Sequence, residues 1–149
     1  MIPPFQPTGL LPPGVHWASG WTEVETRFGG TGRRQKLLMG LSRAIALLES
    51  AGCQSVYLDG SFATAKADPA DYDGCWDTAG VDLTVLDKVF LDFSQKRLAQ
   101  KTRFFGEFFP VTIAHRPGSP SRSIFDMFQR DKDTGKPKGI IGLRLGGLS

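Results

Sequence analysis

One amphipathic helix restricts the folds open to this chain more than any other feature of its sequence. From residue 33 to about residue 50, leucine, isoleucine and alanine recur at helical spacing, and Gly52 follows as a stop signal. Residues 55–58 then form a short run rich in β-forming residues, which ends abruptly at Gly60-Ser61. That pattern is typical of a strand that leads into a tight turn. The sequence therefore combines a long helix with sheet structure in its first half.

The rest of the pattern predicts an α/β (α+β) fold, in which helices flank a small mixed sheet. Further strands are expected at residues 72–76, 104–114 and 139–143, and further helices at 22–28, 83–90, 94–101 and 123–129, with a helical turn at 62–66. Thr22 is expected to cap the first of these helices, and Gly29-Gly30 to end it.

The N-terminal residues differ in composition from the rest of the chain. Residues 1–20 contain five of the ten prolines, which suit neither a helix interior nor a central strand. Aromatic and aliphatic side chains are also present there, and they give the segment groups with which to dock. We therefore expect an extended arm over residues 1–20 and a single domain over residues 21–149.

Composition excludes several classes of protein. With 149 residues, 40% hydrophobic and 22% charged, the chain can bury a core without disulfides or a structural metal. Cys53 and Cys75 form no C-x-x-C motif, and we expect two buried thiols. His16 and His115 are isolated from each other and are expected to be ordinary hydrogen-bonding residues. Because no long apolar run occurs, we expect no membrane span and a cytoplasmic protein.

Basic residues are grouped in three places, although the net charge is only +3. The groups are Arg33-Arg34-x-Lys36, Lys96-Arg97 to Lys101-x-Arg103, and Lys132, Lys136 and Lys138. A solvated helix or loop face is the ordinary interpretation of each group, and a phosphate-binding patch is the alternative.

A glycine–serine turn and two spaced carboxylates form the most informative part of the sequence. A strand that ends in Gly60-Ser61 and opens a helical turn would present backbone N–H groups and a hydroxyl to an anion. After a spacer of nine residues, Asp71 and Asp73 stand two positions apart, so on a strand their side chains share one face. Close carboxylate oxygens suit hard cations such as Mg²⁺. A polar turn after Pro69 is the alternative for the aspartate pair.

This arrangement resembles the signature of the DNA polymerase beta-like nucleotidyltransferase superfamily, in which a Gly-Ser or Gly-Gly pair precedes two carboxylates separated by one residue. The superfamily resemblance covers residues 58 to about 73. More narrowly, Leu58–Lys66, Leu91–Ser94 and Pro137–Ile140 resemble a bacterial family of small nucleotidyltransferase-like proteins, and this likeness extends over most of the chain. The resemblance implies a nucleotidyltransferase-like fold.

Carried over by position, the resemblance implies a role for each motif residue. Gly60 and Ser61 would contact the triphosphate of a nucleoside triphosphate, with Lys66 as a further nucleotide-binding residue. Asp71 and Asp73 would ligate magnesium or manganese and take part in catalysis.

The superfamily normally adds a third carboxylate from a neighbouring strand, as a metal ligand or as the base that deprotonates the acceptor. Glu107 lies in an otherwise apolar predicted strand, where a charged group needs a partner. Asp92 is the alternative; we favour Glu107, because its longer separation from Asp73 leaves room for helices before a third strand. Asp59, directly before the glycine, departs from the superfamily pattern, which usually has a hydrophobic or small residue there.

Two functions of different classes follow from the resemblance. The first is a magnesium-dependent nucleotidyltransferase that modifies a hydroxyl of a tRNA or of a protein, in a toxin–antitoxin or phage-defence pair. The second is a catalytically silent module of the same fold that binds a protein partner, a cognate antitoxin or toxin or a regulator. A third, weaker alternative is an RNA-binding domain that uses the basic helix from Lys96 to Arg103.

Overall fold

A five-stranded mixed sheet forms the centre of the fold. The structure is a computed structural model that describes residues 1–113 and 123–147. Its strands are β1 (Gly14–Trp17), β2 (Ser55–Asp59), β3 (Tyr72–Trp76), β4 (Gly106–Pro110) and β5 (Gly139–Arg144), in the order β1-β5-β2-β3-β4. β2 is antiparallel to both β3 and β5, whereas β1 pairs with β5 and β3 pairs with β4 in parallel. The expected α+β fold with a small mixed sheet is confirmed.

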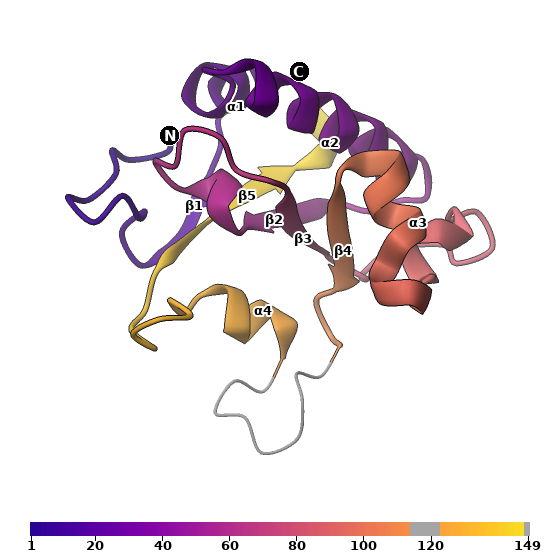
Figure 1. Cartoon of the computed structure of the whole chain (residues 1–149). Helices are drawn as coiled ribbons and strands as arrows, with labels where there is room; N and C mark the ends of the chain where they lie inside the picture. Colours follow the sequence, from indigo (N-terminus) through magenta and orange to yellow (C-terminus); the bar gives the residue numbers. More distant parts are fainter. Residues whose placement is uncertain (114–122, 148–149) are drawn as a thin grey trace.

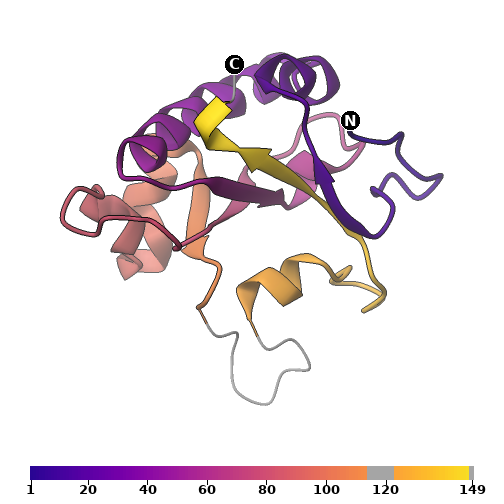
Figure 2. The same cartoon turned by 180° about the vertical axis from the view of Figure 1, so that it is seen from behind.

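Helices lie on both sides of this sheet. They are α1 (Trp21–Phe28), α2 (Gly32–Ser50), α3 (Ser94–Phe104) and α4 (Ile124–Phe128), with short 3-10 helices η1 (Ser61–Ala63), η2 (Lys88–Leu91) and η3 (Leu145–Gly147). α1 and α2 cover one side, α4 lies on the other, and α3 flanks β4 (Figure 1). From behind, β1 and β5 run together at the edge away from α3 (Figure 2). None of the helices within the described residues is sufficiently long and apolar to cross a membrane.

Strand alternation divides the side chains of the sheet between two apolar clusters. Toward α1 and α2, the strands bury Val56, Leu58, Tyr72, Trp76, Phe108, Ile141 and Leu143 in the main core. Toward α4, a smaller cluster contains Cys75, Ile124, Phe128 and Ile140. Because neighbours along a strand point to opposite faces, Asp59, Asp73 and Glu107 lie on the side of the smaller cluster, at the end of the sheet where β2 ends and β3 and β4 begin.

α2 is the helix predicted from residues 33–50, and it begins one residue earlier. Its N-cap is Thr31, whose hydroxyl oxygen accepts the backbone N–H of Arg34 at 3.2 Å. Near its middle, Gly40 lies against the backbone of Phe104 at the end of α3, where a Cβ would not fit. This close approach brings the first half of α2 next to α3 and β4.

Several predicted elements differ in extent from the observed ones. No α-helix forms over residues 83–90; the segment is a turn followed by η2. The side chains of Asp82 and Asp87 accept the backbone N–H groups of Thr84 and Val89, and such local bonds compete with helix formation. The strand predicted over 104–114 is limited to β4, and its predicted end at Ala114 lies outside the described residues.

The remaining differences lie at element ends. α1 begins at Trp21 with Gly20 as N-cap, so Thr22 is not its cap, and the carboxylate of Glu23 accepts the backbone N–H of Ser19 instead. The helical turn expected at 62–66 is the shorter η1. The helix expected at 94–101 extends to Phe104, but residues 95–97 within it are left-handed, with φ of 50–63°, so α3 is kinked there.

The N-terminal segment is joined to the domain at several points. Residues 14–17 form β1, the edge strand beside β5. Ile2 and Leu11 are buried in the main core, and Arg27 of α1 donates to the carbonyls of Ile2 and Pro3 at 2.6 and 2.9 Å. The segment is therefore extended but contributes both a strand and core side chains.

Candidate functional site

The Gly60-Ser61 turn connects the end of β2 to η1. Gly60 has φ of 81° and ψ of −171°, a conformation that is essentially limited to glycine. A Cβ at this position would also lie 2.9 Å from Oδ2 of Asp73. Glycine therefore serves two purposes here, because it permits the turn and lets the backbone approach the carboxylate of β3.

A buried arginine holds the chain that follows this turn. Arg34 of α2 donates to the carbonyls of Phe62, Thr64 and Lys66 at 2.9, 2.8 and 2.7 Å, and to Phe28 at 3.1 Å. Arg34 is only 6% exposed, so it does not belong to a solvated basic face. It fixes the backbone around η1 to the first turn of α2.

Three carboxylates form a row across the sheet. In the antiparallel register Asp59 of β2 is paired with Asp73 of β3, and in the parallel register Asp73 is paired with Glu107 of β4. Directly paired residues project to the same face, with Cβ atoms about 4.5–5.5 Å apart in sheets. Asp71 directly precedes β3 and is not part of the strand, but its charge acts on Asp73 and that of Glu107 acts on it. We call Asp59, Asp71, Asp73 and Glu107 the acidic row.

The members of the acidic row repel one another. The pKa of Asp73 is raised to about 7, first by burial and then by the negative charges of Asp71, Glu107 and Asp59. Burial also raises the pKa of Asp71, and Glu107 adds to that effect. Burial raises the pKa of Asp59, although Lys138 opposes the shift. Burial and the neighbouring carboxylates therefore both disfavour the charged forms of Asp71 and Asp73.

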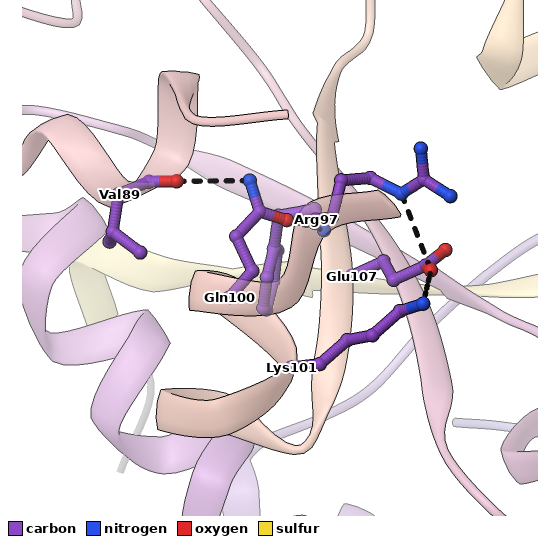
Figure 3. Close-up of polar contacts among 6 residues, drawn as sticks. Val89, Arg97, Gln100, Lys101 and Glu107 are labelled. Atoms are coloured by element: carbon purple, nitrogen blue, oxygen red, sulfur yellow. Dashed lines mark hydrogen bonds and ion pairs between the residues drawn. The ribbon is translucent and has the colours of Figure 1, made fainter. Parts of the chain in front are cut away.

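Cations from two segments reach the ends of the row. Glu107 Oε1 lies 3.3 Å from Nε of Arg97 and 2.9 Å from Nζ of Lys101, both on α3 (Figure 3). At the other end, Lys138 pairs with Asp59 and is almost as buried as its partner. Lys138 directly precedes β5, so this pair ties the start of β5 to the end of β2.

A buried amide fixes α3 beside the row. Gln100 donates from Nε2 to the carbonyl of Val89 in η2 at 3.0 Å, and its Oε1 accepts the backbone N–H of Phe108 in β4 at 2.8 Å (Figure 3). Its side chain is fully buried. These bonds hold α3 against β4, where Lys101, the next residue, and Arg97, in the left-handed stretch before it, both reach Glu107.

Other residues singled out in the sequence lie elsewhere. The Lys66 side chain is exposed, and the Gly60 turn is instead held by Arg34 through the Lys66 carbonyl. Asp92 is in a turn before α3, where Oδ1 accepts the backbone N–H of Ser94 at 3.0 Å. Of the two candidates for a third carboxylate, the structure brings only Glu107 next to Asp73. Arg103 pairs with Asp87 at 3.0 Å.

The two cysteines are buried, and Cys75 lies on the same face of β3 as Asp73. Burial raises the pKa of the Cys75 thiol, and the charge of Asp73 adds to this effect. Cys53 and Cys75 are buried free thiols, as expected. His16 hydrogen-bonds through Nε2 to the carbonyl of Pro12 at 2.6 Å, and His115 lies outside the described residues.

Sequence reasoning missed three residues that shape the site. Arg34 could have been found, because it precedes Leu37 and Leu38 by three and four positions and therefore lies on the apolar face of α2. Gln100 carries the same signal more weakly, four positions before the buried Phe104. The pairing of Asp59 with Lys138 joins positions 79 apart, and no local pattern indicates it.

The chemistry of the row suits hard cations, but its side chains are not gathered around a single point. Within residues 1–113 and 123–147, no three His, Cys, Asp or Glu side chains already stand close enough to hold one ion. The donor atoms of the row are carboxylate oxygens, which magnesium and manganese prefer. A cation bound there would require Asp73 and its neighbours to rotate toward it.

Comparison with known proteins identifies a family but no characterised relative. No curated protein and no solved structure matches the chain significantly. Residues 3–144 match a family of unknown function, DUF6932. The matched region includes the Gly60-Ser61 turn, the whole acidic row and Lys138. The chain therefore belongs to the DUF6932 family.

Proposed function

We propose that the chain is a magnesium-dependent nucleotidyltransferase, which moves an NMP group from a nucleoside triphosphate to a hydroxyl of an RNA, such as a tRNA, or of a protein. The observation that carries this proposal is the position of Glu107 beside Asp73, which adds a third strand to the carboxylates next to the Gly60 turn. The resemblance of residues 58–73 to the superfamily signature supports it independently.

The electrostatics of the row favour a divalent cation there. Burial first, and then repulsion from the neighbouring carboxylates, raise the pKa of Asp73 to about 7, so both disfavour its charged form. Magnesium or manganese bound by Asp71, Asp73 and Glu107 would offset this repulsion and neutralise charge on a triphosphate. Lys101 already contacts Glu107. If the Glu107 carboxylate turned toward the bound cation, the Lys101 ammonium would be left to pair with the triphosphate.

The proposed reaction assigns a role to each part of the site. The acceptor hydroxyl oxygen forms a bond to the α-phosphorus, the bond from that phosphorus to the bridging oxygen breaks, and pyrophosphate leaves with the electron pair. The hydroxyl proton passes to a carboxylate of the row, with Glu107, the third carboxylate, as the candidate base. The backbone N–H groups of the turn and the hydroxyl of Ser61 bind triphosphate oxygens.

A catalytically silent module is the second candidate function, and one observation favours it. Glu107 is engaged by Arg97 and Lys101, and Asp59 by Lys138. If these ion pairs are permanent, the row is a structural network, and the fold serves to bind a protein partner such as an antitoxin or regulator.

The discriminating experiment measures nucleotidyl transfer. The protein is incubated with magnesium, each α-labelled nucleoside triphosphate, and either total tRNA or lysate protein as acceptor. The matched variants are Asp73→Asn, which removes the central carboxylate, and Asp133→Asn, which changes an exposed carboxylate outside the row. We expect label transfer that falls at least about 100-fold in Asp73→Asn, as for loss of a metal ligand or base, and is unchanged in Asp133→Asn.

Either result is informative. Transfer that survives Asp73→Asn would exclude the proposed use of the row. Absence of transfer, together with absence of magnesium-dependent nucleotide binding, would favour the silent module. The cytoplasmic setting and the toxin–antitoxin or phage-defence pairing belong to the same proposal and rest on the resemblance; co-purification of a partner encoded beside the protein would test the pairing.

A further inference from the structure

A basic groove opens onto one end of the acidic row. It lies between the first half of α2 and the end of α3, encloses about 270 Å³, and has Asp71 in its wall. Three cationic side chains, Arg33, Lys36 and Lys101, line it together with this one carboxylate. Because Lys101 also pairs with Glu107, Arg33 and Lys36 against Asp71 leave the groove net positive by one, and it adjoins the carboxylates of the acidic row. An anion attracted to the groove would therefore be held beside the acidic row.

The three cations have different contacts, and Lys101 pairs with Glu107 at 2.9 Å. Arg33 is oriented by bonds from Nε to the carbonyl of Pro69 at 3.2 Å and from Nη2 to that of Ala70 at 2.7 Å. Lys36 is exposed, with its ammonium 4.8 Å from the ring centroid of Phe105. Because carbonyls and aromatic rings carry no net charge, these contacts do not neutralise the positive charge of Arg33 or Lys36.

The floor of the groove is apolar. Leu37 and the half-buried ring of Phe105 form it, and Phe105 is fixed by its left-handed conformation at the end of α3, with φ of 62°. Cations around an aromatic floor suit a ligand that combines a phosphate with a planar base, because phosphate pairs with Arg and Lys and a base stacks on a ring. An acidic peptide would use the cations but not the ring.

We propose that this groove binds the acceptor as a single phosphate-bearing nucleotide, either free or as the terminal nucleotide of a single-stranded RNA. The small volume admits one nucleotide, and Asp71, shared by groove and row, would face its hydroxyl. The proposal deepens the proposed function and rests on it for the role of acceptor, whereas binding itself can be measured without transfer.

The test uses the whole chain, without nucleoside triphosphate. Its probes are a fluorescein-labelled single-stranded RNA of about eight nucleotides, within the usual range of such sites, unlabelled AMP and a polyglutamate peptide. The variants are Lys36→Glu and, as control, Arg43→Glu, the same charge change at an exposed position further along α2 and outside the groove. Unfolding curves establish that both variants are folded.

We expect RNA binding that weakens with salt, falls at least tenfold in Lys36→Glu, and changes less than twofold in Arg43→Glu. AMP that competes as well as RNA would identify a free nucleotide as the ligand, and much tighter RNA binding would identify an RNA end. Equal losses in the two variants, absence of RNA and AMP binding, or displacement of RNA by polyglutamate would overturn the proposal. Asp73→Asn separates the two proposals, since it should abolish transfer but retain RNA binding.

Discussion

Asp73 is the residue on which the electrostatics of the site depend. It lies between Asp59 and Glu107 in the sheet, and Asp71 directly precedes its strand. Its pKa of about 7 arises from burial first and from these three neighbours next. At neutral pH this carboxyl is therefore divided between its protonated and ionised forms, which is unusual for an aspartate.

The raised pKa of Asp73 predicts how stability depends on pH. The carboxyl has an ordinary pKa of 3.8 in an unfolded chain and a pKa of about 7 in the folded protein. Between these values the folded state holds a proton that the unfolded chain has released, so its contribution to stability is lost as pH rises through 7. Relative to the natural protein, Asp73→Asn should gain on the order of 2 kcal/mol between pH 5 and pH 8.

Urea unfolding of both proteins at several pH values measures this difference directly. The free energy of unfolding of the variant minus that of the natural protein should increase from pH 5 to pH 8 in the absence of divalent cations. A difference that stays constant over this interval would show that Asp73 ionises normally and that the row is not mutually repelled.

The sequence predicts those parts of the site whose residues lie close together along the chain. The Gly60 turn and the aspartates at 71 and 73 were identifiable, since they are close in the sequence and have defined spacing. A charge among apolar residues was common to Glu107 and Asp92, and Glu107 was chosen only because its longer separation from Asp73 leaves room for helices. Lys138 gave no such signal, because its partner is chosen by the β2–β5 pairing.

At the scale of elements, α2 determines the shape of the turn as well as covering the sheet. Its Arg34 donates to carbonyls of η1 and the residues after it, and to the carbonyl of Phe28 at the end of α1. Three segments of chain therefore meet at a single guanidinium. The conformation of the turn after β2 therefore depends both on Gly60 and on Arg34 of the neighbouring helix α2.

Arg34→Met should destabilise the protein much more than the same change at an exposed arginine of α2. Loss of the guanidinium leaves buried carbonyls without their donor, and we expect a decrease of about 2–4 kcal/mol in the free energy of unfolding. Arg43→Met, on the exposed side of the same helix, should change it by less than about 0.5 kcal/mol. Chemical denaturation provides the values, and similar losses in both variants would argue against the role of Arg34.

The observed ends of the helices and strands show where local hydrogen bonds outweigh the helix or strand propensity of the sequence. β3 occupies the predicted residues, and so does α2, whose apolar stripe is long. The predicted helix at 83–90 is wrong for a local reason: Asp82 and Asp87 bind neighbouring N–H groups and form turns. Apolar spacing alone does not detect this competition.

At the scale of the whole molecule, the N-terminal segment completes the sheet. β1 covers the edge of β5, and Ile2 and Leu11 fill the main core. Sequence composition identified the segment as extended, but not as a strand, because the proline content argued against a central position. An edge position tolerates neighbouring prolines, since only one side of the strand needs hydrogen bonds.

Removal of residues 1–17 should therefore destabilise the domain, because these residues are part of its sheet and core. Exposure of the core surface now covered by Ile2 and Leu11 alone accounts for a loss of about 3–6 kcal/mol, and β5 would become an unprotected edge. Thermal unfolding and size-exclusion chromatography of the shortened chain should show a large decrease in Tm and a tendency to aggregate. A shortened chain as stable as the full one would mean that the segment is dispensable.

The pairing of β3 with β4 has a consequence for how the site assembles during folding. Asp59 and Asp73 come from adjacent antiparallel strands joined by a short connection, whereas Glu107 arrives after the long crossover that contains η2 and α3. Contacts between residues distant in the sequence generally form later, because more chain entropy is lost in closing the loop. We therefore expect Asp59 and Asp73 to come together early in folding. Glu107 should join them only when α3 packs against β4 and brings Arg97 and Lys101, which pair with Glu107.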